Sequence, residues 1–165
     1  MSGILLSFQL PEMLPELLYG VCLTGGVDGS SADADMWCID LTGRSALDVE
    51  PPKRQTIRKF DPAASSPRSP YRRVAAGDTA HIWWKSRVPA EKRKLGAVTI
   101  RAVNVIEIRH GGAHVFAYAR DGQGEWVRQD IDALARADGF ADVAAFTAYF
   151  VPQPGDIFHG ILIAW

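Results

Sequence analysis

The segment AVTIRAVNVIEIR, residues 97–109, shows the clearest alternation of apolar and polar side chains in this chain. One face of the segment carries Val98, Ile100, Ala102, Ile106 and Ile108, and the other carries Thr99, Arg101, Glu107 and Arg109. Successive side chains of a β-strand point to opposite faces of the sheet. The alternation therefore predicts one long strand with one buried face.

Shorter segments on either side of this strand predict further elements. Apolar runs predict strands over residues 4–8, 53–60, 79–84, 114–119 and 157–165. Helices are expected over residues 11–18, ending at Gly20, and over 127–137 and 143–150, the last capped by Asp142. Five to six strands with short helices between them predict a single α+β domain over residues 1–165, folded as a small closed β-barrel. Closure would hide the edges of such apolar strands.

Residues 21–52 differ from the rest of the chain. They contain Gly25-Gly26 and scattered aspartates, and their apolar residues show little periodicity. Only Met36–Leu41 is apolar enough for a strand. We interpret the region as an inserted loop or small hairpin.

The composition excludes several classes of protein. The chain has 165 residues, 47% of them hydrophobic and 22% charged, as in ordinary globular domains. No apolar run approaches the roughly 20 residues that a membrane-spanning helix needs, and the N-terminus lacks the features of a signal peptide. Two cysteines are too few for a disulfide framework, and the four histidines lack metal-ligand spacing. We expect a cytoplasmic protein with no metal and no cofactor.

Charge is unevenly distributed along the chain. The net charge is −7 over residues 1–52, +9 over residues 53–94 and −3 over residues 95–165, which gives −1 in total. A basic middle between acidic ends is what a localised anion-binding face would produce. A solvated surface balanced by internal ion pairs would produce the same pattern.

The basic middle opens with KRQTIR, residues 53–58. Lys53, Arg54, Thr56 and Arg58 could cradle a phosphate or a base, because guanidinium groups and hydroxyls suit phosphate oxygens. An edge strand defended by charge is the alternative. Lys53 and Thr56 are an odd number of residues apart and would face opposite sides of a regular strand. For the two to act together, Lys53 must precede the strand, or a bulge must re-aim it.

Asp138 is the second residue of interest. With Ile131 and Leu134 it continues the apolar stripe of the predicted helix, and it lies near the negative helix C-terminus. A carboxylate is unfavourable in both respects, which suggests that it has a use. Alternatively, the helix ends early and Asp138 faces water.

Taken in series, several segments resemble the ASCH domains, relatives of the PUA RNA-binding barrel. The matching segments are Leu6-Ser7-Phe8, Gly20, residues 53–58, Gly77-Asp78, Asp138-Gly139-Phe140 and the final strand 158–165. They follow the family's order and span nearly the whole chain. Two features depart from the family pattern: residues 21–52 separate Gly20 from Lys53, and Asp138 stands where some enzymatic members carry Glu.

The resemblance implies two classes of function. In a binding module for RNA or a nucleotide, Arg58 and Thr56 share a strand face, and Lys53, Arg72 and Arg73 hold phosphates. Tyr71, Trp83 or Trp84 stacks on a base. In an amidohydrolase acting on an acetylated cytidine, Thr56 is the nucleophile, Lys53 activates it, and Asp138 orients or relays the proton. A ribonuclease and a protein-interaction module remain further alternatives.

Overall fold

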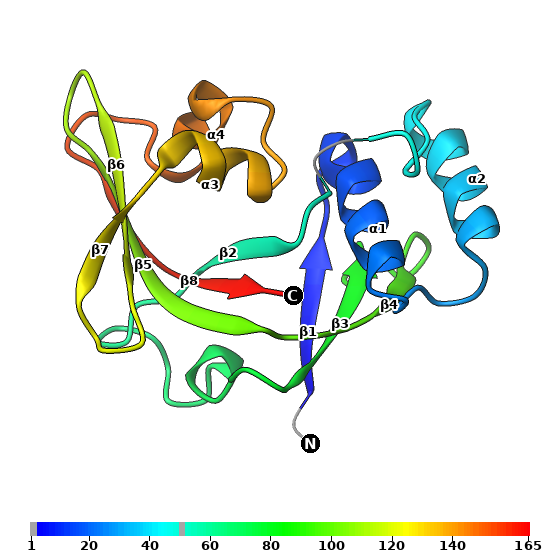
Figure 1. The fold of residues 1–165 in the computed structure, drawn as a ribbon, viewed down its shortest axis with the longest axis horizontal. Coiled ribbons are helices and arrows are strands. Elements are labelled where there is room, and N and C mark those ends of the chain that lie inside the picture. The colour runs from blue at the N-terminus through cyan, green and yellow to red at the C-terminus, as the bar shows by residue number, and fades with distance from the viewer. Residues whose placement is uncertain (1–2, 50–51) are drawn as a thin grey trace. The chain divides into compact units, whose positions relative to one another are not determined.

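The computed structural model describes residues 3–49 and 52–165, and the chain divides into two compact units. Unit 1 comprises residues 1–54, 76–100 and Trp165, and unit 2 comprises residues 55–75 and 101–164. Each unit contains one β-sheet, with its own helices (Figure 1). No helix in the described part of the chain is long and apolar enough to cross a membrane.

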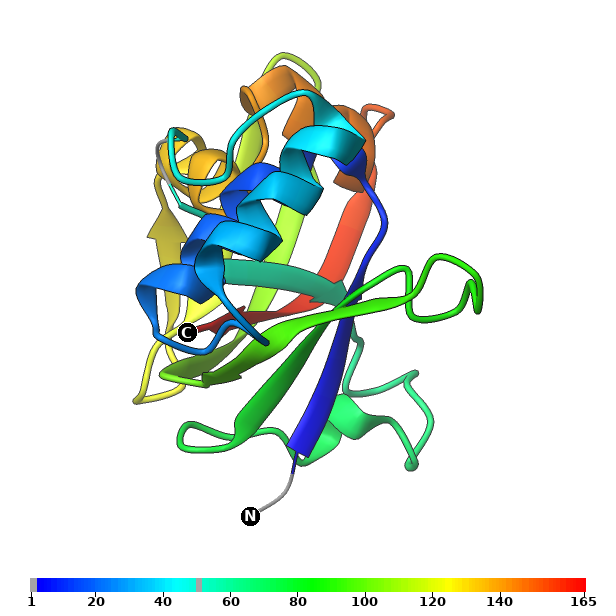
Figure 2. The ribbon, with the colours of Figure 1, turned by 90° about the vertical axis from the view of Figure 1, so that its right-hand side faces the viewer.

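Unit 1 is built on a three-stranded sheet in the order β1-β3-β4. Its elements are β1 (Gly3–Phe8), a 3₁₀ turn η1 (Pro11–Met13), α1 (Leu14–Leu23), α2 (Ser31–Thr42), β3 (Thr79–Trp84) and β4 (Arg93–Thr99). β1 runs parallel to β3, beside which it lies in Figure 2, and β4 is antiparallel to β3. Alternate residues of β1 and β3 are buried, as expected for strands with one face in a core.

The structure corrects our interpretation of residues 21–52. Met36–Leu41 belongs to the helix α2 and not to a strand. The Ser30 side chain caps the helix by accepting from the N–H of Asp33, and Gly43, with φ of +73°, ends it. Only two positions of α2 are buried, so the helical period leaves a faint signal in the sequence. Residues 50–51 of this region lie outside the described residues.

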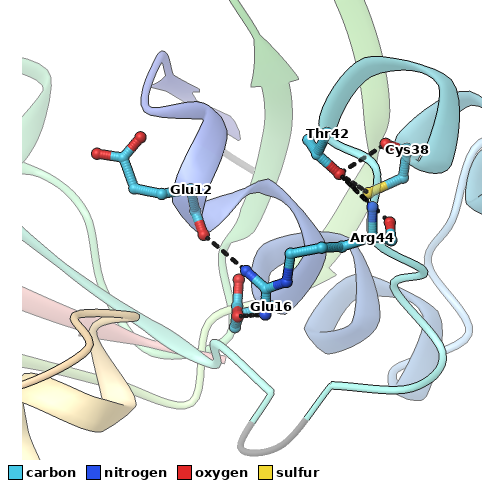
Figure 3. A network of polar contacts seen from close by, with 5 residues as sticks. All are labelled: Glu12, Glu16, Cys38, Thr42 and Arg44. Atoms are coloured by element: carbon cyan, nitrogen blue, oxygen red, sulfur yellow. Dashed lines mark hydrogen bonds and ion pairs between the residues drawn. The ribbon is translucent and has the colours of Figure 1, made fainter.

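Polar contacts attach the segment after α2 to α1 (Figure 3). The Arg44 guanidinium donates to a carboxylate oxygen of Glu16 at 2.7 Å and to the backbone carbonyl of Glu12 at 3.4 Å. The Thr42 hydroxyl donates to the Cys38 carbonyl and accepts from the Arg44 N–H. These contacts fix the path of the chain as it leaves α2.

Unit 2 is built on a five-stranded sheet in the order β2-β8-β5-β6-β7, with every neighbouring pair antiparallel. Its strands are β2 (Gln55–Lys59), β5 (Ala102–His110), β6 (Val115–Arg120), β7 (Trp126–Gln129) and β8 (Ile157–Ala164). Its helices are a 3₁₀ turn η2 (Pro70–Arg72), α3 (Ile131–Ala137) and α4 (Val143–Phe150). Residues of α3 and α4 pack with Ile57, Ile106, Ile108 and Leu162 in one hydrophobic core, so both helices cover the same face of the sheet.

The α+β class is confirmed, but the expected barrel is not. The described residues form eight strands in two sheets, rather than five to six strands closed into one barrel. Strand 79–84 and helix 143–150 are confirmed, and Asp142 caps the helix by accepting from the N–H of Ala145. Helix 127–137 begins only at Ile131, because Trp126–Gln129 pairs with β6 as β7. Gly20 lies inside α1 rather than at its end.

The predicted strand over 97–109 is two strands in different sheets. The N–H of Ile100 donates to the Asp78 carbonyl, next to β3, whereas the N–H of Arg101 donates to the Ala164 carbonyl of β8. Hydrogen-bonding partners therefore change within one peptide step, although the alternation continues. Alternation reports which face of a strand is buried but does not identify the neighbouring strand.

Candidate functional site

Three polar or charged residues are buried in the described part of the chain: Lys53, Thr56 and Asp138, which are 1%, 3% and 4% exposed. Burying a charged or polar group costs free energy unless hydrogen bonds or ion pairs compensate it. The same three residues were expected from the sequence to carry chemistry. Their burial contradicts the alternative in which Asp138 faces water.

Asp138 is held by the way in which α3 ends. It is the C-cap residue, and Gly139 follows with φ of +87°. The N–H of Gly139 donates to Arg136, and the N–H of Phe140 donates to Ala135. This is the Schellman arrangement, in which glycine takes the left-handed position and the next apolar residue packs back onto the core. Phe140 accordingly lies against the core of unit 2, at 5.4 Å between its ring centroid and that of Phe146.

From this position the Asp138 side chain reaches the edge strand β2. Its Oδ1 accepts a hydrogen bond from the backbone N–H of Ile57 at 3.1 Å. That N–H belongs to the peptide that joins Thr56 to Ile57, so the carboxylate lies at the backbone of the predicted nucleophile. The Gln55 amide also donates to the Leu134 carbonyl at 3.3 Å. Two hydrogen bonds therefore hold the end of α3 against β2.

Thr56 and Arg58 lie on the sheet face opposite α3 and α4. Ile57, between them, points into the helix-covered core, and strand side chains alternate. Thr56 lies directly across from Ile163 of β8, and Arg58 lies across from Ile161. β2 ends the order of its sheet and is therefore an edge strand.

Lys53 belongs to unit 1 and precedes β2, which begins at Gln55. Its backbone N–H donates to the Glu16 carbonyl of α1 at 2.8 Å. A Cβ on Gly20 would lie 1.9 Å from the Lys53 carbonyl oxygen, so only glycine permits this contact. The Lys53 ammonium lies 5.8 Å from the centroid of the Phe8 ring. The function of Gly20 is therefore to let α1 pack on the Lys53 backbone.

Trp165 adds a buried donor to this part of unit 1. Its backbone N–H donates to the Arg54 carbonyl at 2.9 Å, and its ring lies edge-on to Phe8 at 6.5 Å. Among the described residues, the buried indole N–H of Trp165 has no hydrogen-bond acceptor. Buried indole donors usually have one. The sequence identifies Trp165 only as the end of a predicted strand, because a donor without an acceptor leaves no pattern in a sequence.

The other predicted ligand-binding residues lie in two places. In unit 2, the Tyr71 ring packs edge-on against Phe60 at 6.3 Å, and Arg73 is exposed. The Arg72 guanidinium donates to the carbonyls of Pro62, Ser65 and Ser66, so three of its five N–H groups already hold the loop before η2.

Arg54 and Trp83 belong to unit 1. Arg54 is exposed. Trp83 is half-buried on the opposite face of β3 from Trp84, which is 2% exposed and therefore cannot stack on a base.

No cluster of three or more His, Cys, Asp or Glu side chains in residues 3–49 and 52–165 is arranged to hold a metal ion. Comparison with known proteins adds no assignment: no family model matches the chain, and neither a curated protein nor a solved structure matches it.

Proposed function

We propose that this protein binds a nucleoside, a nucleotide or an unpaired base of RNA, and that it is of the ASCH type. Thr56 and Asp138 of unit 2 recognise the ligand, with Arg58 beside Thr56 on the same strand face. The resemblance to the ASCH domains assigns Lys53 of unit 1 to the same function.

The observation that carries the proposal is the burial of Lys53, Thr56 and Asp138. Burial takes the charged groups of a lysine and an aspartate out of water, and the cost of that desolvation offsets much of what their interactions contribute. Groups buried at this cost fit a ligand that needs a cation, a hydroxyl and a carboxylate in surroundings of low polarity. A nucleobase offers donors and acceptors on its edge for such groups.

Amide hydrolysis on an acetylated cytidine is a second candidate, favoured by the burial of a threonine within three residues of a buried lysine. In this reaction, Thr56 Oγ1 attacks the acetyl carbonyl carbon and gives its proton to Lys53 acting as a base. The C–N bond breaks, cytidine leaves as the amine with that proton, and an acetyl ester remains on Thr56. Water then hydrolyses the ester to acetate and restores the hydroxyl.

Calorimetric titration with cytidine, acetylcytidine and cytidine monophosphate tests the binding proposal. We expect saturable binding of at least one of them, weakened about tenfold or more by Asp138→Asn or Thr56→Val, since a hydrogen bond to a buried polar group contributes about 1–3 kcal/mol. Matched controls are Asp132→Asn, exposed on the same helix, and Lys59→Met, exposed on the same strand as Thr56. No binding of these or of purine nucleotides at millimolar concentration would refute it.

Incubation with acetylcytidine, followed by chromatography of the products, tests the second candidate. Thr56→Ser keeps a hydroxyl and should retain turnover, whereas Thr56→Val and Lys53→Met should abolish it. If the wild-type protein binds acetylcytidine without releasing acetate, the hydrolase function is rejected and only the binding function stands. Release of acetate that survives Thr56→Val would exclude Thr56 as the nucleophile.

A further inference from the structure

The five-stranded sheet of unit 2 has a second face, which α3 and α4 do not cover. On β5, β6 and β7 the residues of this face alternate with the buried ones: Ile106, Ile108 and Ala117 point into the core, and their neighbours point away from it. The residues pointing away include three arginines and three aromatic side chains. We call them the Arg–aromatic face: Arg109, Phe116, Tyr118, Arg120, Trp126 and Arg128.

The strand register places these residues in rows across the sheet. Arg109 lies opposite Phe116, Tyr118 lies opposite Arg128, and Arg120 lies opposite Trp126. Phe116 and Tyr118 are two residues apart on one strand and are therefore about 7 Å apart along it. Each of these rings therefore lies across from an arginine of the neighbouring strand, and Glu107 lies on the same face opposite Tyr118.

The arginines of this face are not equally available to a ligand. Glu107 accepts from the Arg109 guanidinium and lies 3.4 Å from His159 Nδ1, and its hydrogen bond raises the pKa of Arg109 above the usual value. Within the described ranges, no carboxylate forms an ion pair with Arg120 or Arg128. Both of these arginines are exposed. The face therefore presents two uncompensated cations.

The two uncompensated arginines lie over aromatic rings. Arg120 Cζ is 5.0 Å from the centroid of the Trp126 ring, and Arg128 Cζ is 4.9 Å from that of Phe116. Trp126 is nonetheless 43% exposed, and Phe116 and Tyr118 are half-buried. Packing against the rings limits the freedom of the guanidinium groups, so less conformational entropy is lost when they bind a ligand.

We propose that the Arg–aromatic face binds a single-stranded polynucleotide, with unpaired bases stacking on Trp126, Tyr118 and Phe116 and phosphates contacting Arg120 and Arg128. Stacking platforms flanked by cations are the common means of binding single strands. An acidic peptide would use the two cations but would leave the exposed rings without a partner. A duplex keeps its bases stacked inside and cannot use the rings either. The inference extends the proposed function from a nucleotide to a polymer and rests on it only for the ligand class.

Fluorescence anisotropy with a labelled 12-nucleotide single-stranded RNA tests this inference. Trp126→Ala should weaken binding by about 5- to 150-fold, the loss expected when one stacked base contributes about 1–3 kcal/mol. Trp126→Tyr keeps a ring and should restore most of the affinity. Replacing both arginines, Arg120→Gln with Arg128→Gln, should lower the slope of log affinity against log salt concentration by about 1.4, since each contact with a single strand contributes about 0.7.

The helix-covered side of the same unit provides matched controls. Arg136→Gln and Tyr149→Ala remove an exposed arginine and an exposed aromatic residue from α3 and α4, and both should bind the RNA like the wild type. Duplex RNA should bind at least tenfold more weakly than the single strand. Single-stranded DNA that binds as well as RNA supports the inference, because stacking does not require the 2′-hydroxyl.

Failure to bind either single-stranded RNA or single-stranded DNA would overturn the inference. So would binding heparin as tightly as RNA while Trp126→Ala leaves the RNA affinity unchanged. An equal loss of RNA affinity in Arg136→Gln and in the variants of the Arg–aromatic face would also overturn it. Calorimetry with mononucleotides separates this inference from the proposed function. Loss of RNA binding in Trp126→Ala while Asp138→Asn has no effect on mononucleotide binding would uphold the face and reject the site. If Trp126→Ala leaves RNA binding unchanged while Asp138→Asn weakens mononucleotide binding, the site is upheld and the face is rejected.

Discussion

Asp138 accepts a hydrogen bond from the backbone N–H of Ile57, although the two residues are 81 positions apart in the sequence. The N–H of Ile57 lies on the edge of β2 that is not paired with β8, and without Asp138 it would be a buried donor in need of an acceptor. The Asp138 side chain therefore satisfies one backbone donor at the edge of the sheet and holds a carboxylate beside the Thr56 backbone. Stability and the proposed recognition depend on the same contact.

Asp138→Ala should lower the free energy of unfolding by about 1–3 kcal/mol, because it leaves the buried Ile57 N–H without this acceptor. Asp138→Asn keeps a side-chain carbonyl in the same place and should cost less. Urea denaturation measures both, with the exposed Asp132→Ala as the control on the same helix. If Asp138→Ala unfolded at the same urea concentration as the wild type, the hydrogen bond would not contribute to stability.

Gly20→Ala should destabilise unit 1 and displace Lys53. The added Cβ would lie 1.9 Å from the Lys53 carbonyl oxygen, so α1 or the Lys53 backbone must move. Overpacking of this kind typically costs about 1–3 kcal/mol. Thermal unfolding measures the loss, and nucleotide affinity should fall with it if Lys53 contributes to binding. Gly122→Ala is the control, since a Cβ there meets nothing within 4 Å, and equal midpoints for the two variants would contradict the close contact.

The burial of Asp138 could be predicted from the sequence because this residue is anomalous where it stands. Asp138 continues an apolar stripe at a helix C-terminus, and its burial follows from the Gly139 stop that turns Phe140 into the core. The strand predicted over 53–60 is shorter in the structure, since β2 begins at Gln55, and Lys53 therefore precedes it, which is one of the two arrangements that parity left open. The burial of Asp138 and the position of Lys53 depend on local rules of helix capping and strand alternation, which can be applied to a sequence alone.

The strand partners and the Arg–aromatic face could not be predicted in the same way. The alternation over 97–109 continues through the point at which the chain leaves one sheet for another, because each sheet buries the same face of its strand. Strand β7 is only four residues long and runs almost directly into α3, so its sequence was assigned to the helix. Pairing between strands is a tertiary property, and a short strand carries too few residues to show it.

Arg72→Met should expose the loop before η2 to proteases. The Arg72 guanidinium donates to three backbone carbonyls of that loop, those of Pro62, Ser65 and Ser66. Methionine keeps the bulk of the side chain but none of the donors. A loss of about 1–2 kcal/mol in local stability corresponds to roughly 5- to 30-fold faster cleavage. Arg68→Met, exposed in the same loop, is the control, and equal cleavage rates for both variants would contradict this role of Arg72.

The two thiols should react slowly at neutral pH. Burial raises the pKa of both Cys22 and Cys38 above the usual 9.0, so less thiolate is present than in a free cysteine. The folded protein holds these protons more tightly than the unfolded chain does. The stability that this contributes is present at neutral pH and is lost as pH rises through the raised pKa.

Alkylation by iodoacetamide between pH 7 and pH 10 checks this, with Cys22→Ser and Cys38→Ser assigning the rates. Cys38, which is fully buried, should react more slowly than the half-buried Cys22, and both rates should rise with pH. Unfolding in guanidinium should bring both thiols to the rate of free cysteine. A thiol that reacted at pH 7 as fast in the folded protein as in the unfolded chain would show that burial neither shields it nor raises its pKa.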